Sequence, residues 1–179
     1  MIGLSRDSVL VVAYQPEWAE SFRREAARLR SVLGGGVGQI QHVGSTSVPG
    51  MIAKPIIDMI AAVERLSSAS TFVPVLERLG YEHRPNDPVP GRLFFALGPR
   101  TQRTHHLSLA EVASSFWHEH IAFRDCLLAN RSVAEQYASL KQRLAAQFGH
   151  DRPSYTAAKE EFIRHALSMR DVTPNQRME

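Results

Sequence analysis

Residues 55–63 (PIIDMIAAV) form the most apolar segment of the chain, and one carboxylate, Asp58, stands inside it. A short apolar run of this kind is typical of a strand buried within a sheet. Alternation along the strand would place Asp58 and Ile60 on one face, with Ile57 and Met59 on the other. A carboxylate in apolar surroundings is unfavourable unless ionic or hydrogen-bonding partners compensate it. The fold must therefore supply Asp58 with such partners, which could be a bound cation, an arginine or a turn that the carboxylate caps.

Hydrophobic spacing and turn residues predict the remaining elements. The expected strands are 9–14, 39–43, 92–97 and 104–109, with 81–84 a weaker candidate. The expected helices are one from Pro16 to the glycines at 34–36, one over 71–79, one opened by Ser115, one opened by a capping box of Ser132 and Glu135, and a last one after Gly149. The Pro-rich segment 84–91 is expected to be a loop, and the polar tail after Arg170 is expected to fray.

This order of elements predicts an α/β (α+β) fold. A mixed β-sheet flanked by helices would be followed by a C-terminal helical layer. The length of 179 residues suits one domain, 1–179, with a sheet-rich part over 1–110 and a helical part over 115–170.

The chain shows no membrane or export signal. No apolar run approaches the roughly 18–20 residues that span a bilayer, and the N-terminus does not resemble a signal peptide. Cys126 is the only cysteine, so no intramolecular disulfide can form, which favours a reducing compartment. We therefore expect a cytoplasmic protein with no membrane partner, of undetermined oligomeric state.

The charge of the chain is mildly positive, with a formal net charge of +3. Eighteen of the 21 basic residues are arginines, and they are scattered rather than gathered into a tract. Nucleic acid is therefore not expected as a partner, since interleaved basic and aromatic residues are lacking. The balance is compatible with an acidic small molecule.

A glycine- and hydroxyl-rich loop, 42–50 (HVGSTSVPG), precedes the Asp58 strand. Gly44 would let backbone amides approach an anion closely, while Ser45 and Thr46 would donate hydrogen bonds to phosphate oxygens. The spacing of a P-loop is absent. A plain turn is the alternative, and the combination with Lys54 and Asp58 favours a phosphate site.

Two adjacent histidines, His105 and His106, lie in the strand expected at 104–109. Neighbours in a strand face opposite sides, so at most one can join Asp58. Such an imidazole could act as a general base or bind a divalent metal, or it could simply be a hydrogen-bonded strand residue. Arg103 could contact phosphate, and it is also an ordinary candidate for a surface or helix-to-sheet ion pair.

The segments HVGSTSVPG and AKPIID, the latter ending at Asp58, resemble the GrpB family. Similar stretches follow in the family's order at 14–18 (YQPEW), 103–107 (RTHHL), 123–125 and 158–159. A Gly-Ser pair followed by a strand aspartate also resembles the polymerase-beta-like nucleotidyltransferase superfamily. The resemblance implies a nucleotidyltransferase-like topology, with Gly44 and Ser45 on nucleotide phosphates and Mg²⁺ (or Mn²⁺) on strand carboxylates.

The chain departs from the superfamily at the second carboxylate. Active transferases have Asp-x-Asp or Asp-x-Glu, whereas Ile60 stands at that position here. No substitute is evident on the later strand, and Ser108 stands where the GrpB family commonly has a further histidine. One carboxylate is a poor scaffold for two metal ions.

The leading hypothesis is a protein that binds a nucleotide or another phosphorylated small molecule and transfers a nucleotidyl or phosphoryl group to a small acceptor. The expected catalytic residues are Asp58 and His106, with Asp58 also the metal ligand. The expected phosphate-binding residues are Gly44, Ser45, Thr46, Lys54 and Arg103. The alternative is a catalytically degenerate phosphate-binding module.

Overall fold

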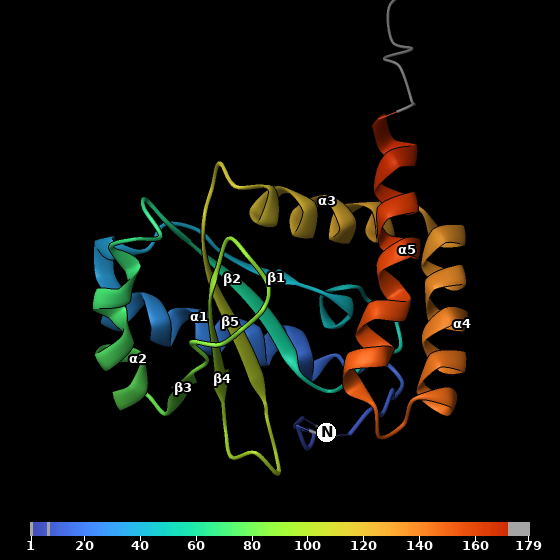
Figure 1. Cartoon of the computed structure of the whole chain (residues 1–179), viewed down its shortest axis with the longest axis horizontal. Coiled ribbons are helices and arrows are strands. Elements are labelled where there is room, and N and C mark those ends of the chain that lie inside the picture. Colours follow the sequence, from blue (N-terminus) through green and yellow to red (C-terminus); the bar gives the residue numbers. More distant parts are fainter. Residues whose placement is uncertain (1, 7, 172–179) are drawn as a thin grey trace, which may run out of the picture.

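A computed structural model describes residues 2–6 and 8–171 of the chain, and its strands form one mixed sheet (Figure 1). The five strands are β1 (Ile40–Val43), β2 (Ile57–Val63), β3 (Tyr81–His83), β4 (Leu93–Leu97) and β5 (His105–Glu111). Their order in the sheet is β1-β2-β5-β4-β3. The two inner neighbours β2 and β5 are parallel, and the other pairs are antiparallel.

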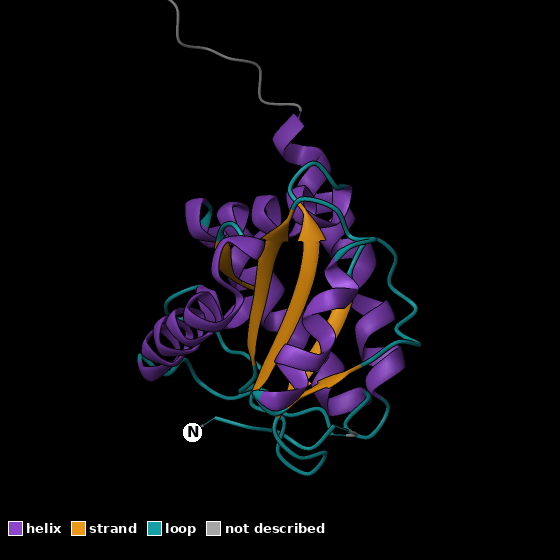
Figure 2. Ribbon diagram, turned by 90° about the vertical axis from the view of Figure 1, so that its left-hand side faces the viewer, coloured by secondary structure: helices purple, strands orange, loops and turns teal. Residues whose placement is uncertain are grey.

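Helices cover both sides of this sheet (Figure 2). The α-helices are α1 (Glu17–Leu33), α2 (Val73–Arg78), α3 (Ser115–Ala129), α4 (Arg131–Gln147) and α5 (Arg152–Asp171). Three short 3-10 turns are η1 (Gly34–Gly36), η2 (Ser45–Ser47) and η3 (Ala69–Phe72). The predicted mixed sheet, flanking helices and C-terminal helical layer are confirmed.

The two faces of β2 pack against different helices. Ile57 and Met59 lie in one core cluster with Trp18 of α1. Ile60 lies in another cluster with Phe116 of α3. This confirms the predicted alternation, and it puts Asp58, next to Ile57, on the α3 side of the sheet.

α4 and α5 stand beside the start of β2, and α3 runs toward them from the other end of the strands (Figure 1). Their shared core also contains Val48 and Met51, which belong to the segment that follows η2. The hydroxyl-rich loop is therefore packed against the helical layer at one end and joined to β1 at the other. This arrangement brings helix residues from late in the chain toward Asp58.

Two local predictions are wrong. Residues 9–14 form no strand, because Val12 makes only an isolated bridge with Ala53. The predicted capping box at Ser132 is also absent, since the side chain of Asn130 accepts the hydrogen bond from the amide of Val133. The polar tail predicted to fray lies, beyond Asp171, outside the described residues.

Within the described ranges, none of the helices combines the length and the apolar character that crossing a bilayer requires.

Candidate functional site

The loop after β1 brings its backbone against Asp58. Val43 pairs with Asp58 across β1 and β2, and the chain then turns sharply at Gly44, whose φ is 69° and ψ −172°. This region of backbone space is essentially restricted to glycine. A Cβ atom on Gly44 would lie 2.9 Å from Oδ2 of Asp58. The carboxylate therefore faces the loop, as the sequence predicted.

Replacing Gly44 by alanine should disturb both the turn and the carboxylate. We expect Gly44→Ala to lower the free energy of unfolding by about 1–3 kcal/mol, because the backbone angles are strained for any side chain. The added methyl group would also displace Asp58. Urea denaturation measures the effect. Gly35→Ala is the matched control, since a Cβ there meets open space, and it should change stability by no more than about 0.5 kcal/mol. Equal stability of the two variants would contradict this prediction.

Asp58 and His106 form a hydrogen-bonded pair across the parallel strands. They are direct partners in the register of β2 and β5, and Nδ1 of His106 lies 2.9 Å from Oδ1 of Asp58. An ionised carboxylate only accepts hydrogen bonds, so Nδ1–H is the donor. His105 faces the opposite side, with Nε2 3.3 Å from the hydroxyl of Ser21. Only His106 therefore joins Asp58, in agreement with the alternation expected for neighbouring strand residues.

The electrostatic environment keeps Asp58 ionised. Its side chain is 42% exposed, and the protein around it still desolvates the carboxylate. Desolvation there raises the pKa of Asp58, and the hydrogen bond from His106, the charge that His106 carries when protonated, and the charges of Lys54 and Arg152 more than reverse this and hold the pKa below its ordinary value. Burial lowers the pKa of His106 despite its contact with Asp58. At neutral pH His106 is therefore neutral, and its Nε2 carries the lone pair.

Three lysines gather around this pair, and they are the only lysines of the chain. Lys141 of α4 is buried, and its ammonium group donates to Oγ of Ser45 at 2.9 Å and to the carbonyl oxygen of Ile52. Lys54 and Lys159 both lie over the ring of Tyr155, at 5.6 and 4.3 Å from its centroid. Lys141 thus reaches the loop from α4, while Lys54, on the approach to β2, and Lys159 of α5 lie over the same tyrosine ring.

The pKa values of all three lysines lie below the ordinary value of 10.5. Burial, together with the charges of Arg152, Lys159 and Lys141, lowers the pKa of Lys54 to about 7 against the opposing effect of Asp58. Burial and the charge of Lys159 lower the pKa of Lys141 to about 7. Burial, with Arg152, lowers the pKa of Lys159 to about 8. A cluster of desolvated cations of this kind is stabilised when an anion joins it.

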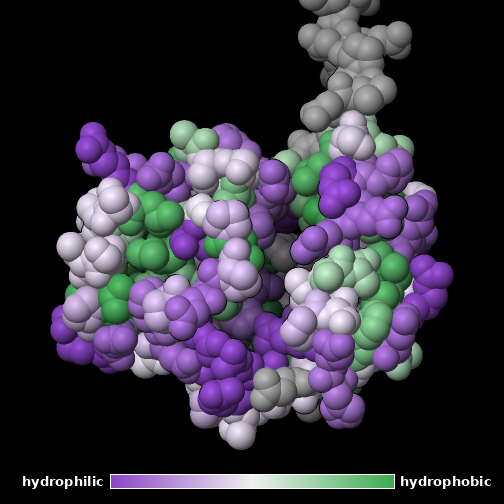
Figure 3. All heavy atoms as spheres, in the orientation of Figure 1, coloured by the Kyte–Doolittle hydropathy of each residue, from purple (hydrophilic) through white to green (hydrophobic). Residues whose placement is uncertain are grey.

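Figure 3 shows a hollow on this face of the molecule, between the part built from the strands and the part built from α4 and α5. Among the predicted phosphate-binding residues, Gly44, Ser45 and Lys54 are brought together with Asp58 and His106. The sequence reasoning did not identify Lys141 or Arg152, and it left the orientation of Lys159 open. The available signal was the scarcity of lysine in an arginine-rich chain.

Two predicted phosphate-binding residues have other roles. Thr46 is only 2% exposed, and its hydroxyl lies 2.9 Å from Nε2 of His42, so it supports the loop from inside. Arg103 is buried, and its guanidinium is engaged by Glu82 of β3 and the carbonyl oxygen of Gly98. Arg103 therefore stabilises the β3–β4 edge of the sheet and does not belong to the group around Asp58.

The donor set does not fit a pair of protein-held metal ions. Across residues 2–6 and 8–171, no three side chains of His, Cys, Asp or Glu are grouped closely enough to hold one. Ile60 is 1% exposed and packs against Phe116, so the position of the second carboxylate is part of the apolar core. A single Mg²⁺ at Asp58 would need most of its oxygen ligands from water and from the bound molecule.

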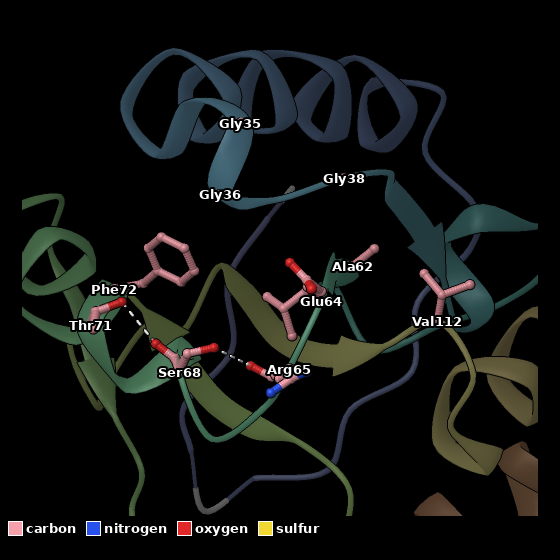
Figure 4. Close-up of a pocket in the computed structure, with 11 residues that line it drawn as sticks. Gly35, Gly36, Gly38, Ala62, Glu64, Arg65, Ser68, Thr71, Phe72 and Val112 are labelled. Carbon is pink, nitrogen blue, oxygen red and sulfur yellow. Dashed lines mark hydrogen bonds between the residues drawn. The ribbon is translucent and has the colours of Figure 1, made fainter.

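A second hollow lies at the opposite end of β2 (Figure 4). It has a volume of about 440 Å³ and is lined by η1, by Phe72 and by residues that follow β2, including Glu64. Its hydroxyl groups are used locally, since Ser68 donates to the carbonyl oxygen of Arg65 and Thr71 donates to that of Ser68. None of the predicted site residues lines it, so the candidate site is the cleft at Asp58.

Comparison with known proteins supports one family. A family model described as GrpB protein matches residues 8–169. Glutamate-rich protein GrpB of Alkalihalophilus pseudofirmus is 36% identical over 94% of this chain and 99% of that protein. Protein YqkA of Bacillus subtilis is 38% identical over 88% of this chain, which spans only 46% of YqkA. The crystal structure of conserved protein GrpB from Enterococcus faecalis aligns with a TM-score of 0.80 and 34% identity, over 90% of this chain and 99% of that one.

Proposed function

The chain belongs to the GrpB family, and from that premise and the geometry of its cleft we propose that it binds the phosphate groups of a nucleotide or another phosphorylated small molecule. The observation that supports this most strongly is that all three lysines lie near the loop or Asp58: Lys141 donates to Ser45, and Lys54 and Lys159 are close enough to Asp58 for the charges to affect one another. Ammonium groups and hydroxyls are natural donors to phosphate oxygens. Gly44 allows the loop to run close beside the bound anion.

The reaction class that we propose is the transfer of a nucleotidyl or phosphoryl group to a small acceptor, on a nucleotidyltransferase-like fold. Asp58 orients His106 and fixes the tautomer that leaves Nε2 able to accept a proton. The proton of the acceptor hydroxyl moves to Nε2 of His106, and the acceptor oxygen forms its bond to phosphorus. The bond to the leaving phosphate breaks, and its electron pair stays on the leaving oxygen.

The alternative is a phosphate-binding module without catalytic activity. The presence of Ile60 at the position of the second carboxylate favours this alternative. That side chain is buried in the apolar cluster beneath α3, so a second carboxylate cannot be supplied from there. The two functions differ in turnover. A His106→Asn variant that binds ligand normally but has lost transfer to an acceptor would favour the enzyme, whereas ligand binding without turnover across a panel of acceptors would favour the module.

Thermal denaturation with ATP, CTP, GTP and UTP tests the binding function. At about a hundred times its dissociation constant, a ligand of the native state should raise the melting temperature by about 5–10 °C. Each nucleotide is measured with and without Mg²⁺ or Mn²⁺, and sodium chloride at equal ionic strength is the control. We expect at least one nucleotide to give this increase. The absence of any increase with all four, under every condition, would count against the proposal.

A further inference from the structure

The cleft contains more positive charge than its own carboxylate can balance. Lys54, Arg152 and Lys159 all act electrostatically on Asp58 or respond to it, and Lys141 acts on Lys54 from the side of Ser45. The three lysines, placed by Ser45 and by the ring of Tyr155, therefore lie in the neighbourhood of one carboxylate. Building on the proposed function, we propose that Lys54, Lys141 and Lys159 take the place of the divalent cation, so that the phosphates of the ligand bind without metal.

Charge balance defines the class of ligand. Cations that are drawn together and desolvated repel one another, and the charged forms of these lysines are favoured when an anion joins them in the same hollow. Asp58 provides one negative charge and is engaged by His106 on one of its oxygens. An anion with two or more charges would balance the remainder. This requirement fits a di- or triphosphate group better than a single carboxylate.

The ammonium groups of the lysines also have hydrogen-bond donors available for a ligand. Lys141 is fixed by Ser45 and Ile52, and so presents a positioned ammonium group at the loop. For Lys54 and Lys159, the described part of the chain provides ring contacts with Tyr155 but no hydrogen bond or ion pair. An ammonium group has three donors, and those of Lys54 and Lys159 remain for a ligand.

A metal ion at Asp58 would meet the same cations. Mg²⁺ binds through anionic and neutral oxygens, usually one or two carboxylates together with substrate phosphates. Here it would have a single carboxylate, close enough to Lys54 and Arg152 for their charges to lower its pKa. The repulsion between these side chains and a divalent ion opposes its binding. The three lysines thus supply the positive charge that a divalent cation would otherwise provide to the phosphates.

Isothermal titration calorimetry with tripolyphosphate and with ATP tests the inference, in EDTA and in excess Mg²⁺. We expect binding in EDTA, equal or weaker binding in Mg²⁺, and no binding of Mg²⁺ alone. Binding at least tenfold tighter in Mg²⁺ than in EDTA would overturn the metal-free site while leaving the proposed function intact. Failure of both ligands to bind under either condition would overturn the proposed function as well.

The variant Asp58→Asn provides the second arm. Its amide oxygen can still accept the hydrogen bond from His106, so the local geometry is kept. If lysines alone neutralise the ligand, removing the neighbouring negative charge should tighten tripolyphosphate binding in EDTA, by about two- to tenfold. If Asp58 holds a metal that bridges to phosphate, the variant should bind more weakly than the parent protein in Mg²⁺. That result would overturn the inference.

Discussion

Replacing Lys141 by methionine should weaken the binding of tripolyphosphate by about tenfold to a hundredfold, the usual range for a lost hydrogen bond to a charged group. Lys141 is 2% exposed, and its contacts with Ser45 and Ile52 leave it little freedom to move. Its ammonium group is thus placed before the ligand arrives, which avoids an ordering cost on binding. Methionine has a similar length and no charge, so it should fill the same space in the protein.

The control for this substitution is Arg143→Gln on the same helix. Arg143 is exposed and lies two residues from Lys141, so it points in a different direction while the change in net charge is equal. Calorimetry should show little change in its dissociation constant. Thermal denaturation should show both variants folded, with Lys141→Met within about 1–2 kcal/mol of the parent protein. Similar affinities for Lys141→Met and Arg143→Gln would exclude Lys141 as a ligand contact.

The elements with strong local signals could be predicted from the sequence. The helix over Glu17–Leu33 follows from regular apolar spacing and the glycines that end it, and β2 follows from its apolar run. Residues 9–14 have an equally apolar pattern but form no strand, because Val9 packs against Leu144 and Tyr155 of the helical layer. That choice depends on tertiary contacts with residues more than a hundred positions away, which periodicity does not contain.

The candidate site could be predicted only in part, for the same reason. The loop at Gly44, the carboxylate of Asp58 and the approach of Lys54 are close in sequence, so their conjunction was visible. Lys141 and Lys159 come from α4 and α5, and only the packing of the helical layer brings Lys141 to the loop and Lys159 near Asp58. Arg103 was misassigned because a basic residue near a candidate site is equally suited to an ion pair, and Glu82 supplies its partner here.

The affinity for tripolyphosphate should decrease by about tenfold or more between pH 7 and pH 9. In the free protein the pKa values of Lys54 and Lys141 are about 7 and that of Lys159 is about 8, against an ordinary value of 10.5. Bound phosphates favour the charged form and raise these pKa values, so the complex holds more protons than the free protein within this window. Each extra proton bound costs about tenfold in affinity per pH unit.

The other titratable side chains near the lysines do not change charge between pH 7 and pH 9. The pKa of Asp58 is held below its ordinary value and that of His42 is about 4, so neither changes charge between pH 7 and pH 9. Tripolyphosphate has two terminal phosphates that lose their last protons in separate steps, the second of them within this window. The ligand therefore becomes more anionic as the pH rises, which by itself would strengthen binding, so the expected decrease in affinity cannot come from the ligand.

Calorimetry in buffers of different ionisation enthalpy should measure proton uptake on binding at pH 8, and Lys141→Met should take up fewer protons than the parent protein. Unfolding of the free protein cannot explain a loss of affinity at high pH, because these lysines make the free protein more stable as the pH rises. Lysines with depressed pKa values lower the stability of the free protein fully below pH 7, and this penalty fades as the pH rises toward 10.5. A dissociation constant that is flat from pH 7 to pH 9, with no proton uptake, would mean that the lysines do not contact the ligand.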